Sequence, residues 1–226
     1  MLLEDFDLKL VKRNLTVKIP EHPIFVESIT YIRSKLGITG LDRVQQSILE
    51  RIIHSSGDLS LQSCIRFSPR ACENAINALK NDAKILTDTY MAEAAISPMA
   101  KRTIKSDVQC ILAKAPTSFD STKTTRSAIG MSSTWLDLEE NENLLHSPIV
   151  VIGSSPTALI SLLDLVESGH SIPSLIIGMP VGFIGVSESK NRLISSDCPF
   201  VVLDGSKGGA SLAAAATNAL LRASEI

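Results

Sequence analysis

Apolar residues recur at helical spacing in the first third of the chain. Between positions 41 and 52 they lie three or four residues apart, at Leu41, Val44, Ile48 and Ile52. Thr39 can cap the start of this helix, with Asp42 three residues on, and Gly57 can close its end. The pattern therefore predicts a helix that ends just after His54.

A second helix is predicted from Ser68 as its cap and Pro69 as its first residue. Its buried face would consist of Cys72, Ala75, Ile76 and Leu79. Residues 1–20, in contrast, mix charged and apolar residues without a clear period and end at a proline. We expect this N-terminal segment to be an extended arm.

Short apolar runs rich in Val, Ile and Leu predict five strands, most of them followed by a helix that Ser, Thr or Pro opens. The runs are residues 84–87, 108–112, 149–153, 175–178 and 200–203. Such alternation indicates a parallel sheet, and uninterrupted apolar strands imply helices on both faces. The sequence predicts an α/β fold: a three-layer α/β/α sandwich with a mainly parallel, five-stranded, doubly wound sheet of flavodoxin-like type and additional N-terminal helices.

Composition narrows the class of protein. With 226 residues, 44% of them hydrophobic, the chain can bury one sizeable core, and we expect a single domain over residues 21–226. A net charge of −2 without Lys/Arg runs argues against nucleic acid as a partner. No apolar run approaches the length of a membrane span, so no membrane partner is expected. Four cysteines without a CxxC pair favour free thiols, and the default is a cytoplasmic enzyme.

Ligands of doubly wound sheets bind beyond the carboxyl ends of the strands. Here those ends are Thr87-Asp88, Gly153-Ser-Ser155, Gly178-Met-Pro-Val-Gly182 and Asp204-Gly-Ser-Lys-Gly-Gly209. Three of the four combine glycine with hydroxyl or amide donors, which suits several carboxylates or phosphates. The alternative is that each loop is only a connection. Neither the GxGxxG nor the GxxxxGK[ST] spacing occurs in them, so a nucleotide is unsupported.

Candidate catalytic residues are few. The histidines at 22, 54, 146 and 170 show no metal-binding spacing, so we expect no metal site, and no GxSxG nucleophile motif occurs. His22, His146 and His170 fall in segments where surface roles are expected. His54 is the strongest candidate because it follows an apolar helix and precedes Ser55-Ser-Gly-Asp58. The alternative is a capping histidine favoured by the helix dipole.

Several segments together resemble one known family. They are Arg51-Ile-Ile-His-Ser-Ser-Gly57, Phe67-Ser-Pro69, Ile85-Leu-Thr-Asp88, Thr125-Arg-Ser-Ala128, Ile152-Gly-Ser-Ser-Pro-Thr-Ala-Leu159, Ile177–Lys190 and Gly205–Ser211. In this order, from near Ile24 to near Arg222, the chain resembles the precorrin-8X methylmutase family of cobalamin biosynthesis. Residues 21–226 would then be a single methylmutase domain, and residues 1–20 have no clear counterpart.

The resemblance implies an isomerase that moves a methyl group from C-11 to C-12 of precorrin-8X or its cobalt complex. No cofactor is consumed. It points to His54 as a general acid that protonates the ring system, and it implies a homodimer. The substrate is a corrin polycarboxylate. Its expected contacts are Arg126, Ser127 and Ser28 on carboxylates, the backbone amides of Gly182, Gly208 and Gly209 on others, Val181 and Phe183 against the ring, and, more weakly, Lys207.

Plainer interpretations stay open for two of these residues and for the function. Arg126 could be a solvated loop arginine, and Lys207 could serve solubility alone. A non-catalytic α/β small-ligand binding module is the main competing function, although Asp88 and Asp204 are too isolated for the acidic cluster of a receiver domain. A nucleotide-dependent oxidoreductase is the other competitor, and the missing phosphate-binding motifs argue against it.

Overall fold

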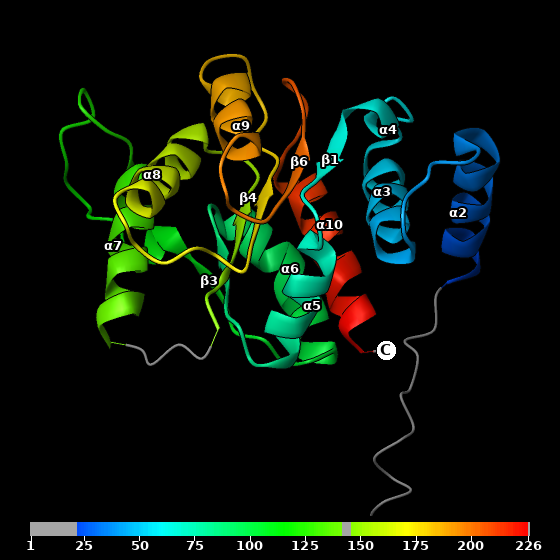
Figure 1. Ribbon diagram of the computed structural model, residues 1–226, viewed down its shortest axis with the longest axis horizontal. Coiled ribbons are helices and arrows are strands. Elements are labelled where there is room, and N and C mark those ends of the chain that lie inside the picture. Colours follow the sequence, from blue (N-terminus) through cyan, green and yellow to red (C-terminus); the bar gives the residue numbers. More distant parts are fainter. Residues whose placement is uncertain (1–21, 142–145, 226) are drawn as a thin grey trace, which may run out of the picture.

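The sheet at the centre of the molecule has the predicted parallel core. The computed structural model describes residues 22–141 and 146–225, so the expected N-terminal arm lies outside the described residues. Within them, six strands form one sheet in the order β1-β6-β5-β4-β2-β3 (Figure 1). The strands are β1 (Ile65–Phe67), β2 (Ile85–Thr87), β3 (Val108–Cys110), β4 (Ile149–Ile152), β5 (Leu175–Gly178) and β6 (Phe200–Leu203). The five parallel strands follow the doubly wound, flavodoxin-like order, which confirms the predicted fold class.

The sixth strand corrects the expected number of five. β1 pairs antiparallel with β6 at the edge of the sheet, with Ile65 opposite Leu203 and Phe67 opposite Val201. It is only three residues long, and Arg66 interrupts its apolar pattern, so the sequence carries no strand signal there. The second predicted strand is also shorter than expected, because the chain turns after Cys110 into a 3-10 helix, η1 (Ile111–Lys114).

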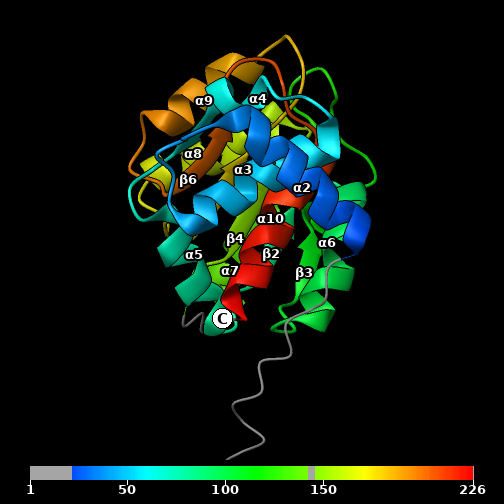
Figure 2. The same ribbon diagram turned by 90° about the vertical axis from the view of Figure 1, so that its right-hand side faces the viewer.

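Helices cover both faces of the sheet. One face packs against α3 (Arg43–Ser56), α5 (Ala71–Lys80), α6 (Tyr90–Arg102) and α10 (Ala210–Ser224), with α2 (Pro23–Leu36) outermost over α3. Figures 1 and 2 show α2, α3 and α10 following one another from the surface toward the sheet. The other face packs against η1, α7 (Arg126–Asn141), α8 (Pro156–Glu167) and α9 (Val186–Ile194). None of the helices in the described ranges is long and apolar enough to cross a membrane.

Strand side chains alternate between the two cores. Ile149 and Val151 of β4 belong to the apolar cluster on the α10 side, whereas Val150 and Ile152 belong to the cluster on the α8 side. All four are fully buried, as the uninterrupted apolar run predicts. The alanines of α10 are buried too, which lets this helix lie close to the sheet.

Two helix starts differ from the prediction. Asp42, not Thr39, caps α3: its carboxylate accepts hydrogen bonds from the amides of Val44 and Gln45, and Gln45 completes the capping box. Gly57 ends the same helix in the left-handed conformation, as predicted. The helix predicted from Ser68 begins at Ala71, because the Ser68 hydroxyl accepts a hydrogen bond from the amide of Phe200 instead of capping.

A short four-residue helix, α4 (Leu61–Cys64), links the end of α3 to β1. Through this link the C-terminal end of α3 lies at the carboxyl edge of the sheet, next to the loop that follows β6. The turn that follows α3 and the glycine loop after β6 therefore meet at this edge of the sheet.

Candidate active site

His54 is an exposed residue of the last turn of α3. Its neighbours Ile52 and Ile53 are buried, so the helix is fixed against the core while the imidazole projects from it. The Nδ1 atom of His54 lies 2.7 Å from the Ser28 hydroxyl of α2, and the ring of Phe25 meets the imidazole edge-on with centroids 4.9 Å apart. Nε2 has no hydrogen-bond partner within the described ranges. One nitrogen is thus held, and the other is left for a ligand.

A hollow of about 320 Å³ opens beside His54. It is lined by Phe25, Arg51, His54, Ser55, Met99, Ala215 and Asn218. The Arg51 guanidinium lies 4.5 Å from the centroid of the Phe25 ring, so a cation, an aromatic ring and the imidazole lie in contact in one wall. The hollow therefore combines apolar surface with one strong donor for anions beside a titratable ring.

Ser28 has a different partner from the expected carboxylate. Its hydroxyl makes the hydrogen bond with His54 Nδ1, and a hydroxyl can either donate to a neutral nitrogen or accept from a protonated one. Ser28 therefore stays a partner of His54 in both protonation states. This contact supports the imidazole, and a bond from Ser28 to a substrate carboxylate stays a prediction.

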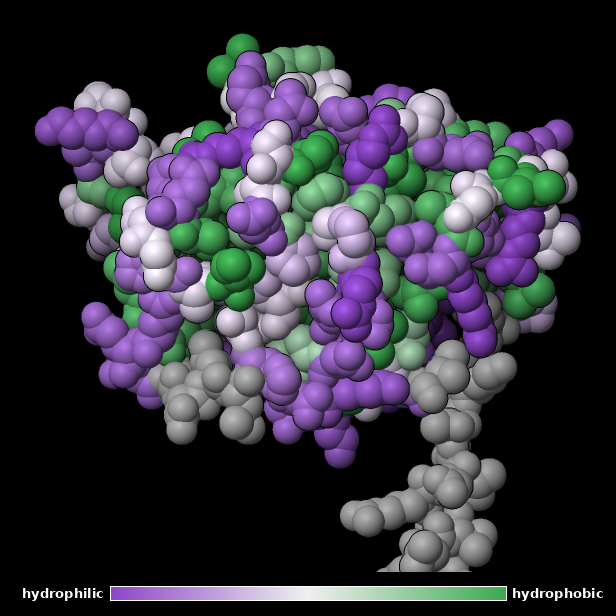
Figure 3. Space-filling view, in the orientation of Figure 1, coloured by the Kyte–Doolittle hydropathy of each residue, from purple (hydrophilic) through white to green (hydrophobic). Residues whose placement is uncertain are grey.

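The loop before α9 carries Val181 and Phe183, which the sequence predicts to be exposed, and also Ile184. Val181 is 50% exposed, and Phe183 and Ile184 are each 89% exposed. Figure 3 shows apolar residues projecting at the upper edge of the molecule, over α9 in the orientation of Figure 1. Such exposed side chains are suited to contact with an apolar ligand or a partner.

The glycine amides of these loops are largely engaged within the protein. The Gly182 amide donates to the Ser206 carbonyl at 3.1 Å, and the Gly209 amide donates to the Met179 carbonyl at 2.8 Å. The expectation that these two amides are free donors for carboxylates is therefore wrong for this structure. A Cβ at Gly208 would lie 2.1 Å from the Met179 carbonyl oxygen, so glycine is required there by close packing of the two loops.

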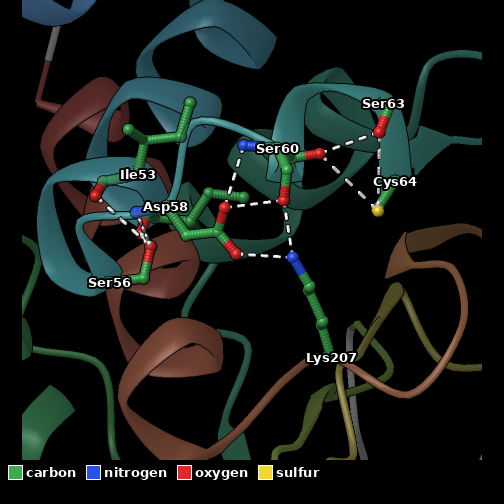
Figure 4. A network of polar contacts seen from close by, with 8 residues as sticks. Ile53, Ser56, Asp58, Ser60, Ser63, Cys64 and Lys207 are labelled. Atoms are coloured by element: carbon green, nitrogen blue, oxygen red, sulfur yellow. Dashed lines mark hydrogen bonds and ion pairs between the residues drawn. The ribbon is translucent and has the colours of Figure 1, made fainter.

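Lys207 also has a partner within the chain (Figure 4). Its ammonium donates to the Asp58 carboxylate at 2.6 Å and to the Ser60 hydroxyl at 2.5 Å. The hydrogen bond from Lys207, with two more from Ser60, lowers the pKa of Asp58 to about 2. The ammonium thus joins two segments of the edge, which is more than a solubilising role, and the expected substrate contact stays a prediction.

Arg126 and Ser127 stand at the start of α7, at the other end of the same edge. Arg126 is exposed, and among the described residues no ion pair holds its guanidinium. The Ser127 hydroxyl lies 2.6 Å from that of Ser155, the capping residue of α8, and 3.2 Å from that of Thr125. Arg126 is thus available to a ligand, whereas Ser127 belongs to a chain of hydroxyl groups that joins the starts of two helices.

The family model for CbiC, precorrin-8X methylmutase, matches residues 23–223. The chain belongs to the precorrin-8X methylmutase family. A cobalt-precorrin-8 methylmutase of Synechocystis is 34% identical, covering 89% of this chain and 95% of the relative. A precorrin-8X methylmutase of Pseudomonas aeruginosa is 36% identical, covering 87% of this chain and 93% of the relative. The crystal structure of precorrin-8X methylmutase from Thermus thermophilus superposes with a TM-score of 0.78 at 30% identity, covering 90% of this chain and 98% of that one. These findings make the protein a methylmutase of cobalamin biosynthesis.

This methylmutase differs from many doubly wound proteins at the point where the strand order reverses, between β2 and β4. There the carboxylate of Asp88 accepts hydrogen bonds from the amides of Ser154 and Ser155, at 2.6 and 2.8 Å. Asp88 is fully buried, and burial raises the pKa of its carboxyl group. Asp88 therefore joins the end of β2 to the turn that opens α8 at this point of the sheet.

Sequence reasoning missed Arg51, Phe25 and Asp58. Arg51 could have been found, because it precedes His54 by three residues on one helix and must share its face. Asp58 was seen only as part of the segment after His54. Phe25 carried no signal, since its approach to His54 depends on how α2 lies across α3. The described residues contain no cluster of three or more His, Cys, Asp or Glu side chains placed to hold a metal.

Proposed function

We propose that this protein moves a methyl group from C-11 to C-12 of precorrin-8X or its cobalt complex, with His54 as general acid. The observation that carries the proposal is the arrangement of His54, with Nδ1 held by Ser28 and Nε2 open beside a hollow that contains Arg51. A methyl shift of this kind looks like a sigmatropic rearrangement, so it needs no nucleophile from the protein. Protonation makes the receiving carbon more electron-poor, and general acids contribute about 10²- to 10⁴-fold.

Ser28 supports this role as a positioning residue. When His54 is protonated, Nδ1–H donates to the Ser28 oxygen and Nε2–H points to the ligand side. After transfer of the Nε2 proton, Nδ1–H keeps the same hydrogen bond. The imidazole can thus give and regain a proton without reorienting, which lowers the cost of the step.

Substrate binding is proposed along the carboxyl edge. The 320 Å³ hollow is at the small end of ligand pockets, so we assign it to one side chain or edge of the macrocycle beside His54. Arg126 is proposed to bind a carboxylate at the far end of the site. Val181 and Phe183 would then cover the apolar ring between His54 and Arg126. Gly208 lies in the loop between these groups, and Ser127 contributes through the hydroxyl chain.

The remaining proposals concern the setting of the enzyme. We propose one methylmutase domain over residues 21–226, because both apolar clusters share one sheet. We propose a homodimer, because Val181, Phe183 and Ile184 are too exposed to be left uncovered at rest. A cytoplasmic location is supported by four free cysteine thiols. A non-catalytic binding module is not favoured by the relatives, which are named as methylmutases.

The test is conversion of metal-free and cobalt-containing precorrin-8 by the purified protein, followed through the visible spectrum. Wild-type protein should convert at least one of them, and His54→Ala should lose turnover by about 10²-fold or more while still binding the product. His54→Ala activity within threefold of wild type would remove His54 from the mechanism. A spectrum that shifts on mixing but never reaches product would instead support the binding-module alternative.

A further inference from the structure

Lys207 is held at both of its ends. Its ammonium bonds Asp58 and Ser60 in the turn that follows α3, as described above (Figure 4). Its backbone carbonyl accepts a hydrogen bond from the ammonium of Lys190 in α9, at 2.7 Å. A second bond of the same length joins Lys190 to the Gly205 carbonyl. The loop 204–209 is therefore gripped from two sides by two lysines.

Lys190 is an unusual residue to find inside a protein. Its exposed fraction is 0%, and lysine is almost never fully buried unless it is paired. Burial of an ammonium is unfavourable unless hydrogen bonds replace its hydration. Both replacement bonds go to carbonyl groups of loop 204–209. Removing Lys190 would therefore leave those carbonyls without their donor, and we expect the loop to shift.

The grip extends to the neighbouring loop. Gly208 packs directly under the Met179 carbonyl, and Ser206 accepts a hydrogen bond from the Gly182 amide. Loop 179–184, with its exposed apolar residues, therefore moves with loop 204–209. Loss of the hydrogen bonds of Lys190 or Lys207 would therefore shift both loops.

At its other end the connection reaches the helix of His54. Asp58 follows His54 by four residues, and its amide donates to the Ser56 hydroxyl at 3.1 Å. That hydroxyl in turn donates to the Ile52 carbonyl at 2.9 Å, inside the last turn of α3. The turn that holds Lys207 is thus tied to the same helical turn that carries the imidazole.

We propose that Asp58, Lys207 and Lys190 form a clasp that fixes the two glycine loops relative to His54, and that Asp58 and Lys207 are positioning residues of the methyl shift. This inference rests on the proposed role of His54. It assigns to the Lys207 ammonium a partner in the protein instead of a substrate carboxylate. The clasp complements the β1–β6 ladder, which ties the backbone of the same two segments farther along.

Steady-state kinetics of Asp58→Asn, Lys207→Met and the double variant test the clasp. Each single variant should lower kcat about tenfold and leave KM within about twofold of wild type. The reason is that misplacing the loops relative to His54 slows mainly the reaction of bound substrate. The double variant should be no worse than either single one, since breaking either end opens the same clasp. If Lys207 instead binds substrate, Lys207→Met alone raises KM and Asp58→Asn leaves it unchanged, which overturns the proposal.

The chain offers a matched control on the other face of the sheet. Lys114 and Asp137 form an ion pair of 3.0 Å with side chains 53% and 43% exposed, against 47% and 37% for Lys207 and Asp58. Lys114→Met and Asp137→Asn should leave kcat unchanged. If the clasp variants lose no more activity than these controls, the clasp is only a surface ion pair.

A charge-reversed pair separates positioning from substrate binding. Asp58→Lys and Lys207→Asp should each be impaired, and their combination should recover activity relative to both, because the ion pair is restored in reverse. A combination as impaired as Lys207→Asp alone contradicts the clasp. His54→Ala is measured in the same assay, so a failure of the acid assignment appears there and not in the behaviour of the pair.

Discussion

At His54, one hydrogen bond decides which nitrogen is available for chemistry. Ser28 bonds Nδ1, so Nε2, on the opposite side of the imidazole, points away from Ser28, and the Phe25 ring packs against the imidazole at 77°. The Arg51 guanidinium lies over the same phenyl ring, so Phe25 contacts both the arginine and the imidazole. The site is thus organised by neighbours of His54 that have no proton-transfer role of their own.

Arg126 gives the residue-scale prediction. Arg126→Ala should weaken binding of the corrin polycarboxylate by about tenfold to a hundredfold, because a hydrogen bond to a charged group contributes roughly 1.5–3 kcal/mol. The turnover of bound substrate should change much less. Affinity is measured by titration of the visible spectrum. Arg126→Lys keeps the charge and loses the fork geometry, so its affinity should lie between those of wild type and Arg126→Ala.

Arg102→Ala, at the far end of α6, serves as a control for the loss of one positive charge. It should bind like wild type. Unchanged affinity in Arg126→Ala would make Arg126 a solvated residue of the helix start, which is the plainer interpretation of its exposure.

At the scale of elements, one carboxylate and one lysine hold turns in a way that the sequence pattern did not indicate. Asp88, at the end of β2, holds the turn that opens α8. Lys190 holds the loop that opens α10. In both cases a buried ionisable side chain uses its hydrogen bonds to fix a loop at the carboxyl edge, where ligands of doubly wound folds usually bind. The proposed substrate site is accordingly shifted sideways, toward α2 and α3.

Lys190 also makes the stability of the protein depend on pH. Burial lowers its pKa from the usual 10.5 to about 8, against smaller opposing effects of Asp204 and Cys64. Between these two values the unfolded chain binds more protons than the folded one, so the free energy of unfolding should rise with pH from about 8 to 10.5. Lys190→Met cannot show this contribution. The free energy of unfolding of wild type, relative to that of Lys190→Met, should therefore rise by on the order of 1 kcal/mol over that range.

Urea unfolding of both proteins at several pH values measures this difference. Lys123→Met, which removes a lysine whose side chain is 81% exposed, controls for titration of surface groups. Parallel pH profiles of wild type and Lys190→Met would show that the ammonium is not desolvated by the fold.

Across the whole molecule, the sequence predicted the fold better than the site. Buried strands such as Ile149–Ile152 are apolar throughout, and that signal depends only on local composition. Edge strand β1 has no such signal, because its pairing with β6 is decided by the path of the chain after α4. The hydrogen-bond partners of Ser28, Lys207 and Gly209 likewise could not be predicted from local sequence, because each bond joins residues from distant segments. Motif resemblance found the right loops, and only the structure shows which donors in them are already used.

The last prediction concerns assembly. If loop 179–184 covers a second subunit, light scattering should give wild-type protein twice the mass of one chain at micromolar concentration. Phe183→Ser and Ile184→Ser remove apolar side chains that are each 89% exposed, so they should shift the protein toward monomer without lowering the free energy of unfolding of the subunit. Ile172→Ser is the control, because Ile172 is 46% exposed but lies before β5, at the opposite edge of the sheet. A loop-variant dimer as stable as wild type would assign these side chains to the substrate alone, and a monomeric wild type would remove the dimer altogether.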